Sequence, residues 1–284
     1  MIAVTGASGK LGRLVIEGLL DKVAAESVVA VVRSPEKVAD FAARGVAVRR
    51  GDYADPASLT AAFEGVERLL LISSNDLGRR AAQHRAAIDA AAAAKVRAMA
   101  YTSVLKAERT TVTALKDHKI TEDTLRSSGI PYIFLRNGWY IENQTENLAS
   151  PFAQGAFFGA AQNGRISAAS RSDYAAAAVR VLTESGHEGR TYELAGEQSY
   201  SMAELATTVS KWSNKSLPYK DVPPDAYKAA LLGAGLPEPL ANFLTEADIA
   251  VSRGELEAET NHLPDLIGRP PRTLADLLAD LPKP

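Results

Sequence analysis

A glycine-rich turn between a predicted strand and a predicted helix is the strongest constraint on the fold of this chain. Gly6, Gly9 and Gly12 follow the apolar residues 1–4, and leucine and valine then recur at helical spacing over residues 11–19. Such glycines permit a tight turn, close approach of the backbone to a pyrophosphate, and close packing of helix on strand. The spacing is Gly-x-x-Gly-x-x-Gly, so it predicts a dinucleotide site and leaves a structural turn as the alternative.

Arg33 closes a second predicted strand, residues 28–32, at the position where dinucleotide-binding proteins recognise the ribose of the cofactor. An acidic residue there accepts hydrogen bonds from the ribose hydroxyls of NAD, whereas an arginine can pair with the 2′-phosphate of NADP. No Asp or Glu stands at this strand end, and Glu36 lies in a predicted helix start. Arg33 therefore favours NADP, and a surface ion pair of Arg33 is the alternative.

Strand and helix patterns alternate through the first half of the chain. Further strands are predicted at residues 46–50, 68–72, 98–102 and 132–135, and helices between them at residues 58–63, 80–95 and 115–127. This alternation predicts an α/β fold with a Rossmann-type doubly wound parallel sheet and helices on both faces.

The regular alternation stops after the sixth predicted strand, where polar, aromatic and proline-containing segments follow. We expect an NADP-binding Rossmann domain over residues 1–136 and a smaller mixed α/β C-terminal lobe over residues 137–284 that binds the substrate. A helix and a strand within residues 173–195 are expected to return to the main sheet. Ser201 is the predicted N-cap of another helix, because Glu204 completes a capping box.

The composition excludes several classes of function. The 284 residues include 32 basic and 34 acidic ones, and no basic run is long enough to follow a nucleic acid. Cysteine is absent, so the chain has no disulfide, thiol nucleophile or thiolate metal site, and the histidine spacing predicts no metal site either. No apolar stretch reaches membrane-spanning length, and no signal-peptide pattern precedes the first strand. We therefore expect a cytoplasmic protein with a small-molecule partner.

Two loops follow strands at the edge where open α/β sheets bind their ligands. Small polar side chains in residues 73–75 could flank the ribose and phosphates of a cofactor, and a plain loop is the alternative. Aromatic side chains in residues 137–140 suit a flat ligand, and lid packing is the alternative. Arg171 could reach an anionic group or pair with Asp173 at the start of a helix.

These motifs together resemble the NmrA-like group of atypical short-chain dehydrogenases/reductases. The resemblance lies in residues 5–12, 31–33, 51–53, 70–74, 101–103, 135–140, 155–174 and 192–196. Within the group, the chain is similar to the bacterial NADPH:quinone oxidoreductases of type 2, with the triphenylmethane reductases as near relatives. The resemblance implies that NADPH is held by Gly6, Ala7, Ser8, Gly9, Lys10, Leu11, Arg33, Ser73, Ser74, Asn75, Asn137, Gly138, Trp139, Tyr140, Ile141, Glu142 and Arg171.

One departure from ordinary short-chain dehydrogenases concerns proton transfer. Their Tyr-x-x-x-Lys pair is replaced by His118 and Glu122 in the corresponding stretch, and His118 is the only histidine expected near the cleft. Reduction of a quinone needs no such proton-transfer pair, because hydride addition gives a stabilised aromatic anion that water can protonate. We therefore expect an NADPH-dependent quinone reductase with direct hydride transfer and assign no catalytic side chain. The alternatives are a non-enzymatic NADP(H)-sensing regulator and a reductase of triphenylmethane dyes; a homodimer is also considered.

Overall fold

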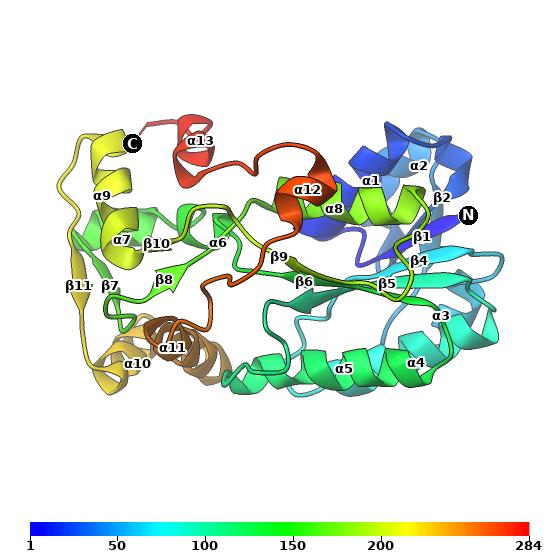
Figure 1. Ribbon diagram of the computed structural model, residues 1–284, viewed down its shortest axis with the longest axis horizontal. Helices are drawn as coiled ribbons and strands as arrows, with labels where there is room; N and C mark the ends of the chain where they lie inside the picture. Colours follow the sequence, from blue (N-terminus) through cyan, green and yellow to red (C-terminus); the bar gives the residue numbers. More distant parts are fainter. Residues whose placement is uncertain (284) are drawn as a thin grey trace.

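A seven-stranded parallel sheet forms the centre of the computed structural model, which describes residues 1–283 (Figure 1). The strands stand in the order β3-β2-β1-β4-β5-β6-β9, and their bounds are β1 (Ile2–Thr5), β2 (Val28–Val32), β3 (Ala47–Arg50), β4 (Arg68–Leu71), β5 (Ala98–Val104), β6 (Tyr132–Asn137) and β9 (Thr191–Leu194). The strand order reverses between β1 and β4, so the sheet is doubly wound. The predicted Rossmann-type α/β fold is confirmed.

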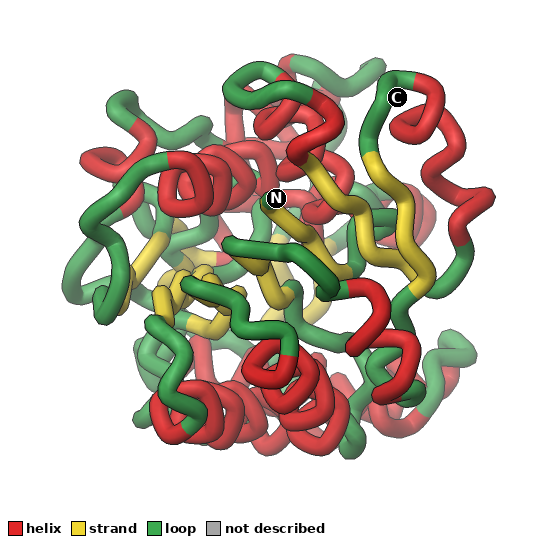
Figure 2. Tube along the Cα trace, turned by 90° about the vertical axis from the view of Figure 1, so that its right-hand side faces the viewer, coloured by secondary structure: helices red, strands yellow, loops and turns green. Residues whose placement is uncertain are grey.

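Helices cover both faces of the sheet (Figure 2). Each face has its own hydrophobic core. One face carries α1 (Lys10–Leu20), α2 (Ala39–Ala43), α8 (Arg171–Thr183) and α12 (Leu263–Ile267); the other carries α3 (Pro56–Ala62), α4 (Arg80–Ala93) and α5 (Lys116–Ser127). The short 3-10 helices are η1 (Ala25–Ser27), η2 (Pro35–Val38) and η3 (Thr113–Leu115). A Cβ on Gly18 of α1 would lie 2.9 Å from Cγ2 of Val179 in α8. Glycine therefore allows these two helices, far apart in sequence, to pack closely.

β5 and β6 continue beyond the ends that the sequence pattern predicts, to Val104 and Asn137. The extension includes Arg136, which lies beside Ser103 in the ladder and is buried. Its guanidinium lies 2.7 Å from Glu122 and 2.8 Å from Glu193, so the buried charge is compensated. Polar residues at the ends of both strands therefore reach the ligand-binding edge of the sheet.

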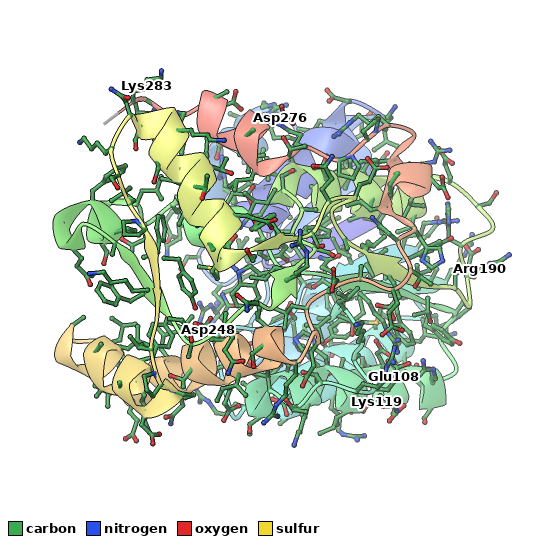
Figure 3. All side chains as sticks on the ribbon, turned by 60° about the vertical axis from the view of Figure 1, so that its left-hand side comes forward. Glu108, Lys119, Arg190, Asp248, Asp276 and Lys283 are labelled. Carbon is green, nitrogen blue, oxygen red and sulfur yellow. The ribbon has the colours of Figure 1, made fainter. Side chains whose placement is uncertain are left out.

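The second lobe lies beyond the carboxyl ends of the strands and has its own apolar cluster. Its strand pairs are β7 (Phe157–Gly159) with β11 (Tyr219–Asp221) and β8 (Arg165–Ile166) with β10 (Tyr200–Ser201). Its helices are α6 (Glu142–Thr145), α7 (Ala149–Gln154), α9 (Met202–Ser213), α10 (Pro224–Gly233), α11 (Glu238–Ser252) and α13 (Leu274–Ala279). Ser201 caps α9 through the predicted capping box with Glu204. Figure 3 shows Asp248 of α11 in this lobe.

β9 is a strand of the main sheet and α8 packs against one face of it, although both follow the first strands of the second lobe. β9 pairs in parallel with β6, with Thr191 opposite Phe134. The chain therefore crosses into the second lobe after β6, returns through α8 and β9, and leaves again. Within residues 1–283, no helix is both long and apolar enough to cross a membrane.

Candidate active site

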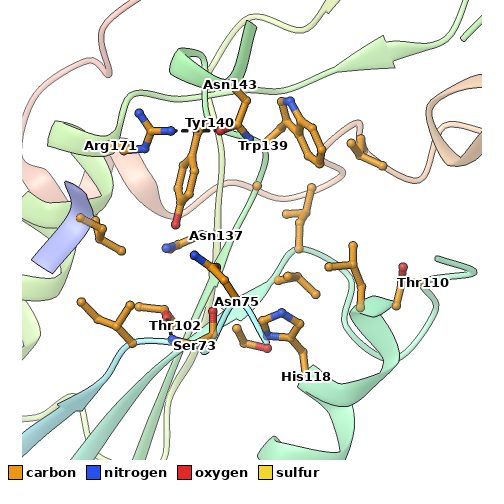
Figure 4. A pocket seen from close by; sticks show the side chains of 18 of the residues that line it. Ser73, Asn75, Thr102, Thr110, His118, Asn137, Trp139, Tyr140, Asn143 and Arg171 are labelled. Carbon is orange, nitrogen blue, oxygen red and sulfur yellow. Dashed lines mark hydrogen bonds between the residues drawn. The ribbon is translucent and has the colours of Figure 1, made fainter. Parts of the chain in front are cut away.

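A cavity of about 600 Å³ opens where the carboxyl ends of the central strands meet the second lobe (Figure 4). Its walls come from the glycine loop before α1, from the segments that follow β4, β5 and β6, and from α11 and the residues after it. The volume is within the range of small-molecule and cofactor sites. The cavity lies at the edge where open α/β sheets bind their ligands.

The glycine loop borders the cavity and leaves the N-terminus of α1 open. Gly6 has a backbone φ of +60°, which residues with a Cβ rarely adopt. A Cβ on Gly12 would lie 2.8 Å from the Cα of Ala7, so only glycine lets the helix follow the turn this closely. Gly9 is the N-cap of α1, and no side chain caps the first turn. The N–H groups of that turn, together with the helix dipole, are suited to an anion.

Two cations border the glycine loop, and one carboxylate binds both. Lys10 Nζ and Arg171 Nη1 lie 2.5 and 2.6 Å from the two carboxylate oxygens of Glu146. A second guanidinium nitrogen of Arg171 donates to Asn143 Oδ1 at 3.0 Å. Glu142 accepts a hydrogen bond from the backbone N–H of Arg171 at 2.8 Å. These contacts connect the glycine loop and α8 to α6 of the second lobe.

Asn137, the last residue of β6, has a buried side-chain oxygen that accepts no hydrogen bond within residues 1–283. It is 6% exposed and lines the cavity, and its Oδ1 has no hydrogen-bond partner within residues 1–283. Asp173 Oδ1 also lacks a hydrogen bond there, but it lies 2.6 Å from the guanidinium of Arg269. Asp173 thus pairs with Arg269 and not with Arg171. An unpaired buried acceptor costs about 1–3 kcal/mol, so Asn137 Oδ1 fits a ligand that brings a donor into the cavity.

One part of the cavity lining is aromatic and apolar. Trp139 and Phe243 are nearly parallel, with ring centroids 6.2 Å apart and an angle of 21° between their planes. Leu105, Leu115 and Leu256 add apolar lining. Because these side chains come from both lobes, a flat apolar ligand would contact the sheet domain and the second lobe together.

Two buried histidines lie beside the cavity. His118 of α5 lines it, and His118 Nδ1 lies 2.7 Å from the hydroxyl oxygen of Tyr101. His84 of α4 accepts a hydrogen bond from the backbone N–H of Ser74 at 2.9 Å. Burial lowers the pKa of His84 to about 3 and holds the pKa of His118 well below its usual value, and the charge of Arg80 lowers both further. Both imidazoles are therefore neutral at physiological pH.

Mild acid is expected to destabilise the fold through these histidines. A histidine whose pKa falls on folding binds its proton only in the unfolded chain, so stability is lost as the pH falls below the unfolded value of 6.5. From about pH 7.5 to about pH 5.5, His84 and His118 together should remove roughly 3 kcal/mol from the free energy of unfolding. Asp248 should offset about 1 kcal/mol of this loss, because burial raises its pKa to about 6.

Urea unfolding at the two pH values measures this loss, with His84→Gln as the matched variant. Glutamine keeps an acceptor and a donor at this position but cannot be protonated in this range. On acidification the variant should lose roughly 1.4 kcal/mol less than the wild type. A free energy of unfolding that stays constant down to about pH 5.5 would contradict the neutral state of both histidines.

Most of the residues predicted for the cofactor site meet at the cavity. Those that line it are Gly6, Gly9, Lys10, Leu11, Ser73, Asn75, Asn137, Gly138, Trp139, Tyr140 and Arg171. Outside its lining lie Ala7, Ser8, Arg33, Ser74, Ile141 and Glu142. Ala7 and Ile141 are buried in apolar clusters, whereas Ser74 and Glu142 hold His84 and Arg171 in place.

Arg33 lies at the exposed end of β2, next to β1 and the glycine loop. The surface ion pair that the sequence left as an alternative does not form between Arg33 and any other residue of the described chain. A hydrogen bond from Arg79 lowers the pKa of Asp76, and the charge of Arg33 adds to this effect. Arg33 is therefore an exposed cation without an ion-pair partner among residues 1–283.

Arg80 and Phe243 line the cavity but were not predicted from the sequence. Arg80 begins α4, is 5% exposed, and donates from Nε to the backbone carbonyl of Ser74 at 2.7 Å. The available signal is helical spacing, because Arg80, His84 and Ala91 share the buried face of an alanine-rich helix. Phe243 lies in α11, and no local pattern connects that helix to the sheet.

The strand order, the glycine turn and the position of the cavity define a Rossmann-type dinucleotide-binding protein with an additional lobe beside the cavity. The model of the NmrA-like family matches residues 1–259. The chain belongs to the NmrA-like family, and the resemblance stated from its motifs is confirmed.

Known members of the family are similar over nearly the full chain. Quinone oxidoreductase 2 of Escherichia coli (strain K12) is 47% identical over 281 residues, which cover 99% of this chain and 98% of that protein. The crystal structure of the Escherichia coli NADPH-dependent quinone oxidoreductase complexed with NADPH has a TM-score of 0.96 at 46% identity and covers 98% of this chain and 99% of that chain. The Citrobacter sp. triphenylmethane reductase complexed with NADP(H) has a TM-score of 0.94 at 39% identity, with coverage of 98% and 99%.

Proposed function

We propose that this chain is an NADPH-dependent oxidoreductase that reduces quinones by direct hydride transfer. The observation that carries the proposal is one cavity that is lined both by the glycine loop and by the rings of Trp139 and Phe243. Such a cavity can hold a dinucleotide and a flat second ligand in contact, as hydride transfer requires. The similarity to quinone oxidoreductase 2 over the full chain supports the same function.

The residues around the cavity fit NADPH. The backbone of residues 6–11 would hold the pyrophosphate at the N-terminus of α1, with Lys10 and Arg171 as neighbouring cations. Arg33 would pair with the 2′-phosphate. Residues 73–75 and 137–142 would flank the ribose and the nicotinamide, and the unpaired Asn137 Oδ1 would accept an N–H of its carboxamide. When bound, NADPH supplies a hydride.

The chain itself would orient the substrate and leave the final proton to water. Trp139 and Phe243 offer a flat apolar surface on which a quinone can lie. Because the pKa of His118 is well below its usual value, His118 has no imidazolium proton to give as a general acid near neutral pH. Reduction of a quinone by a hydride transfers two electrons and gives a stabilised aromatic anion. This anion takes its proton from water, so the missing tyrosine–lysine pair is not required.

A turnover screen tests the proposed function. NADPH is expected to be oxidised with a soluble benzoquinone, giving NADP⁺ and hydroquinone in equal amounts, and more slowly with a triphenylmethane dye or an aldehyde. Faster turnover of the dye would favour the dye reductase. Binding of NADPH without its oxidation by any of these acceptors would favour the NADP(H)-sensing regulator.

We also propose a cytoplasmic location, because NADPH is available there as a reductant. The division into a cofactor-binding domain over residues 1–136 and a substrate-binding lobe over residues 137–284 is part of the same proposal. It includes the return of residues 173–195 to the sheet, which the pairing of β9 with β6 supports. The homodimer stays a prediction that sedimentation equilibrium can test.

A further inference from the structure

A hydrogen-bonded cluster lies behind the cavity wall and has no role in the mechanism above. Tyr101 of β5 is fully buried, and its hydroxyl lies 2.7 Å from Nδ1 of His118 on α5. The two rings are tilted by 31° with centroids 5.8 Å apart, and the hydrogen bond joins their polar atoms. The edge of the His118 ring that carries Nε2 is on the other side of the imidazole.

The hydrogen-bond partners in this cluster determine which atoms are donors and which are acceptors. His84 Nε2 accepts from the backbone N–H of Ser74, so its proton is on Nδ1, which donates to Thr121 Oγ1 at 2.9 Å. Thr121 donates its own hydroxyl proton to the backbone carbonyl of Asp117 at 2.9 Å. The Thr121 hydroxyl thus uses its proton and one of its two acceptor lone pairs.

The Tyr101 hydroxyl has one partner at hydrogen-bond distance within the described chain, which is His118 Nδ1 at 2.7 Å. Burial raises the pKa of the Tyr101 hydroxyl far above its usual value, so the phenol keeps its proton and donates it to this nitrogen. A neutral imidazole that accepts at Nδ1 carries its hydrogen on Nε2. The contact with Tyr101 therefore selects the Nε2–H tautomer of His118.

The buried polar atoms that lack a hydrogen bond show where His118 Nε2 lies. Within residues 1–283, the enclosed side-chain polar atoms without a hydrogen bond are Asn137 Oδ1 and Asp173 Oδ1. His118 Nε2 has no hydrogen-bond partner either, so it is not enclosed by protein atoms. Because His118 is 2% exposed and lines the cavity, its remaining accessible atom opens into the cavity.

We propose that Tyr101 is a positioning residue that holds His118 as a neutral hydrogen-bond donor, through Nε2–H, to the carbonyl oxygen of a quinone substrate. This inference rests on the proposed function. A fixed donor at the oxygen that gains negative charge stabilises the transition state more than the ground state. His118 keeps its proton throughout. A site with such a donor also favours carbonyl acceptors over cationic dyes that have no oxygen to accept the bond.

The tautomer can be measured without any turnover. In protein with ¹⁵N-labelled histidine, the NMR signals of His118, assigned with His118→Gln, should show hydrogen on Nε2 and none on Nδ1. Tyr101→Phe should give a mixture of the two tautomers. Tyr192→Phe is the matched control, because Tyr192 contacts His187 Nδ1 at the same distance of 2.7 Å outside the cavity.

Kinetics give the second readout. Tyr101→Phe should lower kcat with benzoquinone on the order of threefold to tenfold, in proportion to one hydrogen bond, with the Kd for NADPH unchanged. Tyr192→Phe should change neither value. A wild type that reduces quinone but carries hydrogen on Nδ1 of His118 would overturn this inference alone, as would a shifted tautomer in Tyr101→Phe with full kcat. A wild type with no quinone turnover would instead contradict the proposed function.

Discussion

Replacing Gly9 with valine is expected to remove NADPH binding from a protein that still folds. The backbone at Gly9 is extended, with φ −77° and ψ 164°, so a side chain causes no backbone strain. Its Cβ would lie 3.2 Å from the carbonyl oxygen of Gly6, and the two methyl groups would occupy the space in front of the first turn of α1. Loss of two charge-assisted hydrogen bonds at about 1.5–3 kcal/mol each lowers the affinity by more than about a hundredfold.

Titration calorimetry with NADPH measures this loss, and thermal unfolding of the apoprotein shows that the fold is kept. Gly9→Ala should have an intermediate affinity, since it adds the Cβ without the branched methyl groups. Gly233→Ala is the control glycine, because a Cβ at this position of α10 meets no atom within 4 Å. If Gly9→Val binds NADPH with wild-type affinity, the phosphates do not lie at the N-terminus of α1.

Arg33→Ala is expected to weaken NADPH binding by about tenfold to a hundredfold and to leave NADH binding nearly unchanged. The 2′-phosphate is the one group that distinguishes the two cofactors, and Arg33 is an exposed cation at the strand end where it is recognised. Separate titrations of both cofactors give the ratio of affinities.

Arg79→Ala is the matched control for Arg33. Arg79 is also exposed, and it pairs with Asp76 at 2.7 Å on the loop after β4. Its removal changes the surface charge by the same amount and should not alter the preference for NADPH. An equal loss of NADPH and NADH affinity in Arg33→Ala would show that Arg33 contributes general charge and not recognition of the phosphate.

The parts of the fold that sequence could predict are those set by local patterns. The glycine turn is fixed by backbone sterics at Gly6 and Gly12, and the buried strands appear as short apolar runs. The capping box at Ser201 needs only four consecutive residues and is present as predicted. The ends of β5 and β6 were predicted too early, because a strand containing Arg136 is stable only with Glu122 and Glu193 beside it.

The aromatic wall of the cavity depends on contacts between distant segments, which local patterns do not contain. Phe243 faces Trp139 only because α11 packs against the segment before α5. Glu146 bridges Lys10 and Arg171 from a different lobe, and no spacing in the sequence indicates this contact. His118 was correctly expected near the cleft, but its neutral state results from burial and from the charge of Arg80.

Direct hydride transfer from NADPH to a quinone is the central claim, and stereospecifically deuterated cofactor tests it most directly. Single-turnover oxidation of NADPH by benzoquinone is followed with unlabelled cofactor and with each of the two forms that carry deuterium on one face of C4. A cavity that presents one face of the nicotinamide to the substrate predicts that one deuterated form reacts more slowly and that the other reacts at the unlabelled rate. Equal rates for all three forms, or no oxidation of bound NADPH, would contradict the account.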